Sequence, residues 1–159
     1  MTRPASPTSR RLPLYESPED LRLGTWVQWV RTFYRLQRRV TDALTRHEIT
    51  LPQFDVLATL RFSEGVTQQE LAERLLVTKG NVCGVLDRLE KLGWVKRSPD
   101  LTDGRVNRVS LTPDGRRKVE LVMPDHNETV LQVLRALPSD EQVRSLRRML
   151  VALDQENPG

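Results

Sequence analysis

The chain has 159 residues with a formal net charge of +4, and 38% of its residues are hydrophobic. This length suits one ordinary domain, and the balance of 25 basic against 21 acidic residues excludes a disordered polyelectrolyte. The single Cys excludes an internal disulfide and multi-cysteine metal sites, the two His lack metal-ligand spacing, and no apolar run reaches membrane-helix length. The sequence therefore predicts a cytoplasmic protein with no secretory signal, no cofactor and no membrane partner.

The chain begins with a stretch rich in proline, serine and arginine. Residues 1–16 show no hydrophobic period, which predicts a flexible basic arm that either stays disordered or touches DNA or a partner subunit. Ser17 and Pro18 then supply an N-cap and a first helical position for a helix that runs to about Arg46. Apolar residues cover more than one face of this helix, so we expect it to pack on two sides, and another subunit is a candidate for one of them.

Three shorter helices follow, and each opens on a threonine. Residues 50–53 and 67–70 have the pattern of capping boxes, and Thr78 caps a further helix that Gly93 closes. The inner face of the helix after Thr78 consists of Val82, Val85, Leu86 and Leu89. Two short helices joined by a tight turn are typical of a helix-turn-helix.

After Gly93 the pattern changes to strands. Residues 94–98 and 106–111 predict a pair, and the second strand alternates apolar Val109 and Leu111 with polar side chains. Asp103 and Gly104 between them are a favourable hairpin turn pair. A helix-turn-helix followed directly by a hairpin predicts a winged helix.

Two helices complete the chain. One starts at Thr112 and Pro113, and Pro124 should kink or break it; the other starts with a capping box at residues 139–142. The predicted fold is mainly α (α+β): a winged helix-turn-helix at residues 50–112, with residues 17–48 and 113–155 forming a helical dimerisation region.

A winged helix binds DNA through the start of its second helix, its wing and the amides and hydroxyls around them. Basic and amide side chains occur in all three places, whereas isolated surface charges would be the alternative interpretation. The helix starts contribute Thr67, Gln68, Gln69, Thr78, Lys79, Asn81 and Cys83, and the hairpin contributes Lys96, Arg97, Arg105 and Arg108. This distribution favours double-stranded DNA as the partner.

Four segments carry a family resemblance: TLPQFDVLATL, TQQELAERLLVTKGNVCGVLDRLEKLGWVKR, DLTDGRVNRVSLTPDG and LPSDEQVRSLRRMLVAL. Through them the chain resembles the MarR family of bacterial ligand-responsive transcriptional regulators. The resemblance implies a homodimer that binds a palindromic operator, usually as a repressor, and leaves it on ligand binding or oxidation. It also implies that Arg105 enters the minor groove while Asp103 holds the shape of the wing. Gly84 departs from the family pattern, where a larger polar or basic residue is common.

The expected sensor is a small aromatic or phenolic ligand, which in this family lies between the dimer helices and the DNA-binding lobe. The candidate ligand-binding residues are Trp26, Trp29, Phe33, Tyr34, His47 and Phe54. An aromatic stripe at helical spacing also suits a protein core, and His47 also suits a helix cap or surface position. Cys83, on the DNA-facing helix, is either a redox switch or a small filler.

Two other function classes remain at this point. A winged-helix protein-interaction or architectural DNA-binding module would need no ligand and no operator. An enzyme is not expected, because the sequence shows no nucleophile–base pair, phosphate-binding glycine loop or metal cluster.

Overall fold

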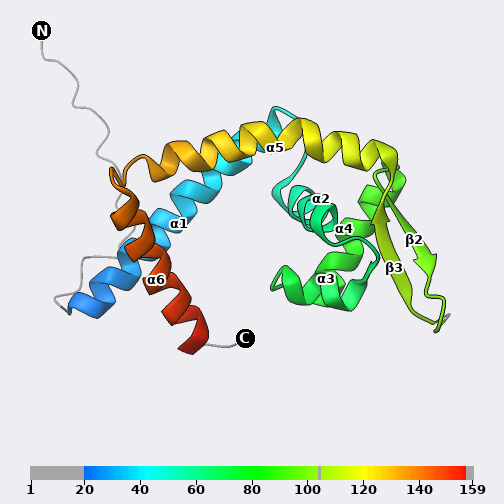
Figure 1. Ribbon diagram of the computed structural model, residues 1–159, viewed down its shortest axis with the longest axis horizontal. Helices are drawn as coiled ribbons and strands as arrows, with labels where there is room; N and C mark the ends of the chain where they lie inside the picture. The colour runs from blue at the N-terminus through cyan, green and yellow to red at the C-terminus, as the bar shows by residue number, and fades with distance from the viewer. Residues whose placement is uncertain (1–19, 104, 157–159) are drawn as a thin grey trace, which may run out of the picture. The chain divides into compact units, whose positions relative to one another are not determined.

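The computed structural model describes residues 20–103 and 105–156, so the arm expected at residues 1–16 lies outside the described part. The described chain is mainly helical (Figure 1). It divides into two compact units between Gln37 and Arg38. Helix α1, Leu21–Thr45, spans the division between them. Its first backbone amides, of Arg22 and Leu23, donate to the Asp20 carboxylate at 2.8 and 3.0 Å. The start predicted at Ser17 and Pro18 lies outside the described residues.

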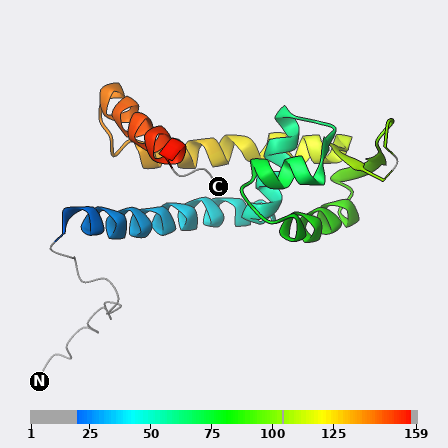
Figure 2. The ribbon, with the colours of Figure 1, turned by 90° about the horizontal axis from the view of Figure 1, so that it is seen from below.

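The second unit contains one hydrophobic core. Helices α2 (Leu51–Phe62), α3 (Gln68–Arg74) and α4 (Lys79–Lys91) pack on one another, as both views show (Figures 1 and 2). The fully buried side chains include Leu57, Leu60, Leu71, Leu86 and Leu89. Leu44 and Val119, from helices on either side in sequence, belong to the same core. Both segments predicted for dimerisation therefore also contribute to the core of the lobe.

The predicted helix starts of this lobe are confirmed. Thr67 and Glu70 form a reciprocal capping box, in which the Thr67 amide donates to the Glu70 carboxylate at 2.7 Å and the Glu70 amide donates to the Thr67 hydroxyl at 3.1 Å. Gln53 likewise accepts a bond from the Thr50 amide at 2.9 Å. Gly93 has φ +71 and directly follows Leu92, the C-cap of α4, as predicted.

The wing belongs to a three-stranded antiparallel sheet in the order β1-β3-β2. Strands β2 (Val95–Pro99) and β3 (Asn107–Leu111) form the predicted hairpin. Beyond the last strand pair, the Asp100 amide donates to the Val106 carbonyl at 2.8 Å, so the connecting loop is longer than the expected two-residue turn. Strand β1, Val66–Thr67, was not predicted, because two residues are too short to show alternation.

Helix α5, Pro113–Leu134, continues through Pro124, so of the expected kink or break, the break is wrong. Val119 and Val122 are buried and hold the helix on the core. Pro124 has no backbone amide, so the carbonyl of Glu120, four residues earlier, lacks its helical partner. Both residues are exposed, so water can bind this carbonyl. Helix α6, Asp140–Glu156, follows with no buried residue among those described.

Candidate nucleic-acid interface

The N-terminal half of α4 presents a polar outer face. Lys79, Asn81 and Cys83 are exposed. On the inner face, Val82, Leu86 and Leu89 are buried and Val85 is half-buried. The Thr78 hydroxyl accepts a bond from the Asn81 amide at 3.3 Å, so this hydroxyl caps the helix. The Lys79 and Asn81 side chains therefore project from the first turn of the helix that a winged helix places in the major groove.

The glycines of this helix leave its outer surface open. A Cβ added at Gly80 or Gly84 would meet nothing within 4 Å outside the backbone of the helix. The space at Gly84 would therefore accept the larger side chain that is common in the family, and the departure noted from the sequence does not arise from crowding.

The start of α3 lies in the same lobe. The Thr67 hydroxyl is engaged as the helix cap, and the Gln69 side-chain amide donates to Glu73 at 2.8 Å. Gln68 is half-buried and Gln69 is exposed. The cap holds the pKa of the Glu70 carboxyl below its ordinary value, because the Thr67 backbone and side chain both hydrogen-bond to it.

The wing loop is organised around Asp100, a residue that the sequence analysis missed. Its side chain is only 6% exposed, and its carboxylate accepts bonds from the Thr102 amide and hydroxyl and from the Asp103 amide. Hydrogen bonds from Thr102, and then from Asp103 and Arg108, hold the pKa of the Asp100 carboxyl well below its usual range. An aspartate two residues before a threonine, in a hairpin loop, is the available sequence signal for such a turn.

Asp103 and Arg105 are joined by a hydrogen bond in the wing loop. The Asp103 carboxylate accepts a bond from the Arg105 amide at 3.0 Å, which fixes the backbone of the loop beside the arginine. The Arg105 side chain is exposed, and so is that of Lys96 on β2. These two cations are the members of the predicted hairpin set whose side chains project from the wing.

Arg108 is engaged within the lobe, which changes the role predicted for it. Its guanidinium pairs with Asp100 and also donates to the Gly65 carbonyl at 2.6 Å. The side chain thereby joins the wing loop to the turn that precedes α3. The sequence could not show this pairing, because Arg108 and Gly65 are 43 residues apart.

The side chain of Arg97 is also bound within the lobe. Its guanidinium donates to Asp87 and to Glu90 of α4, each at 2.6 Å, and its side chain is 18% exposed. Its buried Nε finds no hydrogen-bond partner among the described residues. Partial burial disfavours the charged form, but the bonds to Asp87 and Glu90 outweigh this effect and raise the pKa of Arg97 above its ordinary value. Arg97 therefore fastens β2 to α4.

The six candidate ligand-binding residues are distributed over the two units. Trp26, Trp29, Phe33 and Tyr34 are exposed on the part of α1 in the first unit, and His47 and Phe54 belong to the second unit. Phe54 is 2% exposed, belongs to the core and lies against the His126 ring, with 4.5 Å between centroids. Its burial fits the alternative of a core aromatic. His47 is half-buried, and its Nε2 lies 2.8 Å from the Asp125 carboxylate of α5.

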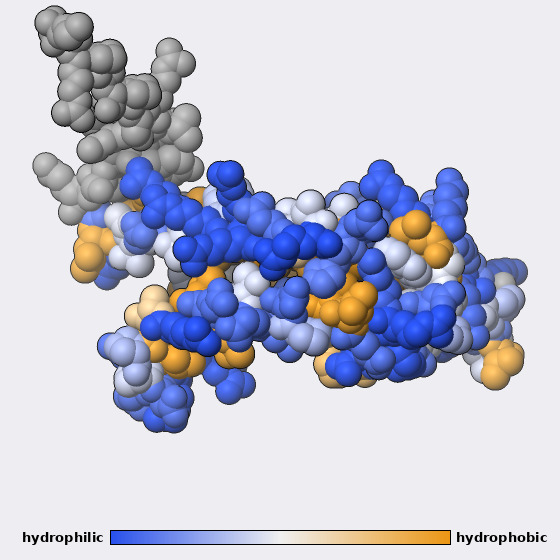
Figure 3. Space-filling view, turned by 90° about the horizontal axis from the view of Figure 1, so that it is seen from above, coloured by the Kyte–Doolittle hydropathy of each residue, from blue (hydrophilic) through white to orange (hydrophobic). Residues whose placement is uncertain are grey.

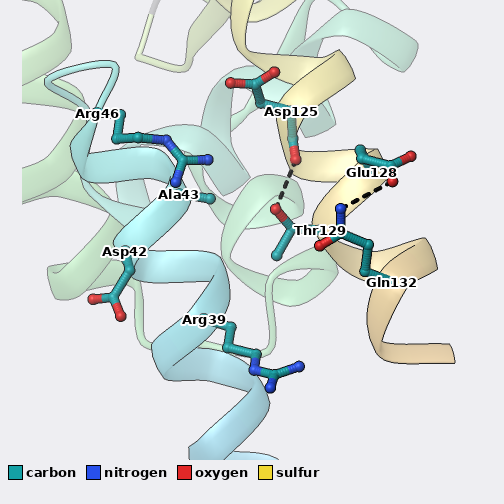
Figure 4. Close-up of a pocket in the computed structure, with 8 residues that line it drawn as sticks. All are labelled: Arg39, Asp42, Ala43, Arg46, Asp125, Glu128, Thr129 and Gln132. Carbon is teal, nitrogen blue, oxygen red and sulfur yellow. Dashed lines mark hydrogen bonds between the residues drawn. The ribbon is translucent and has the colours of Figure 1, made fainter. Parts of the chain in front are cut away.

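The cleft described in the second unit has a different lining. It has a volume of about 440 Å³ and lies between the C-terminal part of α1 and α5 (Figure 4). Its walls are polar and contain none of the six candidates; they consist of Arg39, Asp42, Ala43, Arg46, Asp125, Glu128, Thr129 and Gln132.

Across residues 20–103 and 105–156, the helices are too short or too polar to cross a membrane.

The model of the MarR family matches residues 47–106, which contain the helix-turn-helix and most of the wing. Uncharacterized HTH-type regulators of Bacillus cereus are 34% identical over 100 residues, and the match spans 66%, just under two thirds, of their length. A further similar protein, PecS of Dickeya dadantii, is also an HTH-type transcriptional regulator and is 27% identical over 118 residues.

Solved structures agree with the fold. A mutant of Escherichia coli MarR in complex with operator DNA superposes with a TM-score of 0.75 at 28% identity, covering 84% of this chain and 94% of that one. A regulator from Streptomyces coelicolor, also solved with DNA, has a TM-score of 0.80 at 23% identity and supports the fold alone. The multiple antibiotic resistance protein MarR of Salmonella typhimurium is 33% identical over 132 residues, covering 83% of this chain and 90% of that protein. The chain therefore belongs to the MarR family.

Proposed function

We propose that the protein is a homodimeric repressor that binds a palindromic operator and leaves it when a small aromatic ligand binds. The observation that carries this proposal is the exposed first turn of α4 in the same lobe as a hydrogen-bonded wing with Arg105 at its tip. A related protein with this fold is described in complex with operator DNA. In our assignment, Lys79 and Asn81 read bases, and Thr67, Gln68 and Lys96 contact the backbone.

An unpaired apolar surface supports the dimer. Met149, Leu150 and Val151 are exposed on α6, and Leu121 and Leu131 are exposed on α5. Exposed apolar side chains on a terminal helix favour association with a second helix, and most homo-oligomers are two-fold dimers. We assign residues 17–48 and 113–155 to this association and residues 50–112 to DNA binding.

The proposed mechanism is a population shift. A ligand that binds better to one arrangement of the dimer favours it, and the two α4 helices then no longer match half-sites one helical turn apart. The exposed aromatic residues Trp26, Trp29, Phe33 and Tyr34 are the candidates for the ligand contact. Such a protein acts on chromosomal DNA and would work in the cytoplasm.

The operator is tested with purified full-length protein and a labelled duplex from the DNA beside its own gene. We expect tighter binding to this duplex than to a scrambled duplex of the same composition at 150 mM salt, roughly the physiological ionic strength. Inserting about five base pairs between the half-sites should abolish tight binding, because it turns one half-site to the other side of the helix. Equal affinity for the native and scrambled duplexes would refute the specific regulator and favour the architectural module.

The ligand is tested by titrating phenols and aromatic carboxylates into the protein–DNA complex. We expect at least one to release the DNA from the wild type and to act more weakly on Trp26→Ala. Release of both proteins at the same concentration would remove Trp26 from the ligand site.

The redox alternative has its own observation, because Cys83 is an exposed free cysteine on the outer face of α4. Under this alternative, hydrogen peroxide releases the wild type from the duplex and leaves Cys83→Ser bound. Identical behaviour of the two proteins would eliminate Cys83 as the switch.

A further inference from the structure

We propose that Leu101 is an apolar DNA contact, which packs against the sugar walls of the minor groove beside Arg105. This inference rests on the proposed DNA binding and adds to it a residue that contributes contact area rather than charge. The observation is an uncovered leucine on a loop that is already ordered.

The order of the loop comes from its internal bonds. The Asp100 carboxylate accepts from the Thr102 amide at 2.7 Å, from the Thr102 hydroxyl at 2.5 Å and from the Asp103 amide at 3.1 Å. Arg108 pairs with the same carboxylate and connects it to the Gly65 carbonyl. The backbone on both sides of Leu101 is therefore held in place, and little loop ordering remains to oppose binding.

The exposure of Leu101 is complete. Its relative accessible surface is 103%, the largest among the exposed large hydrophobic residues of the described chain. Figure 3 shows apolar surface at the end of the second unit that carries β2 and β3. A hydrogen-bonded turn thus points a leucine into solvent at the part of a winged helix that reaches DNA.

The neighbouring charge indicates which surface would cover this leucine. Arg105 follows four residues later in the same loop, and a narrow minor groove attracts arginine through its negative potential. The walls of that groove are deoxyribose, and minor-groove binding proteins place apolar side chains against or between the nucleotides. A guanidinium directed into the groove brings Leu101 to its wall, where the leucine can exchange water for sugar carbons.

The two residues should differ in how salt affects their contributions. A contact to phosphate or to the groove potential releases counterions, so its loss reduces the slope of log K against log salt concentration. An apolar contact releases no counterions, so its loss weakens binding equally at each salt concentration. This difference separates a contact made by Leu101 from displacement of Arg105.

The experiment measures Kd by fluorescence anisotropy for the full chain and the duplex from beside its own gene, between 50 and 200 mM salt, the range in which phosphate contacts change affinity strongly. We expect Leu101→Ala to raise Kd about tenfold with an unchanged slope, and Leu101→Met to bind like the wild type. Arg105→Ala should reduce the slope by about one for each copy bound. The matched control is Leu92→Ala. Leu92 is 50% exposed and lies at the opposite end of α4 from Lys79, so the Kd of this variant should equal that of the wild type.

Three binding results would overturn the inference. These are a wild-type Kd for Leu101→Ala, a reduced salt slope for Leu101→Ala, and an equal loss of affinity for Leu92→Ala. The thermal midpoint of each variant is measured in parallel, and a lowered midpoint for Leu101→Ala would also count against a leucine that contacts only DNA. Failure of the wild type to prefer this duplex would refute the proposed function itself, so the two failures are distinguishable.

Discussion

The replacement of Gly115 by alanine tests how closely α5 approaches the sheet. Gly115 is buried in the first turn of α5, and a Cβ placed on it would lie 1.8 Å from the Trp94 carbonyl oxygen and 2.7 Å from its carbon. Both neighbours are backbone atoms, so no side chain can rotate away. The same carbonyl accepts a bond from the Thr112 amide at 3.1 Å, and this bond joins the residue before β2 to the residue between β3 and α5.

The magnitude follows from opposing contributions. Relief of the contact requires the backbones to separate by more than 1 Å, since real Cβ atoms essentially never lie within 3.0 Å of another heavy atom. Overpacking of this kind costs about 1–3 kcal/mol, and weakening the Thr112 bond costs about 1 kcal/mol more. Alanine recovers about 1 kcal/mol through its higher helix propensity. Gly115→Ala should therefore lower the free energy of unfolding by about 1–3 kcal/mol.

The matched control is the same substitution at Gly84, within α4. A Cβ at that position meets nothing within 4 Å outside the helix backbone, so only the propensity gain remains. Gly84→Ala should raise the free energy of unfolding by about 0.5–1 kcal/mol. Urea denaturation followed by circular dichroism, at one protein concentration, measures both variants. Gly115→Ala as stable as the wild type would refute the close approach, and equal destabilisation of both variants would refute the assignment to packing.

Four further predictions concern the interface and its support. Arg105→Ala should weaken operator binding by about 1–3 kcal/mol without changing the thermal midpoint; unchanged affinity would remove Arg105 from the interface. Arg97→Met should destabilise the lobe by about 1–2 kcal/mol in urea and leave the salt slope of DNA binding intact, whereas a slope reduced by about one would make Arg97 a phosphate contact. Because the folded-state pKa of Glu70 lies below its ordinary value of 4.5, the stability it supplies is present above that value and is lost as pH falls through the folded pKa. Glu70→Gln should therefore flatten the acid side of a stability–pH curve, and an unchanged curve would contradict the capping box. Leu76 is exposed and has φ 53, a left-handed backbone conformation that glycine adopts more easily than leucine. Leu76→Gly should therefore raise the free energy of unfolding by about 0.5–1 kcal/mol, and with it the thermal midpoint. A lowered midpoint would show that the leucine side chain packs in solution.

Local signals predicted the elements, whereas contacts between distant residues decided the roles of several side chains. The helix after Thr67 could be predicted because its cap is complete within four residues. The continuity of α5 through Pro124 could not, because it depends on Val119 and Val122 packing on a core built from other helices. Phe54 illustrates the same limit, since helical spacing does not distinguish an aromatic residue in a pocket from one in the core.

The arginines of the wing show what this limit means for DNA binding. Four cations in one hairpin looked alike in sequence, yet Arg97 and Arg108 pair with acidic residues of the lobe. Those acids, Asp87, Glu90 and Asp100, would repel phosphate if they were left unpaired near the interface. Pairing them fastens the wing to α4 and to the turn before α3, and it also neutralises negative charge where DNA is expected. The attraction to phosphate is then left to the exposed cations, Lys96 and Arg105 among them, so the salt dependence of binding should be smaller than the number of basic residues in the wing implies.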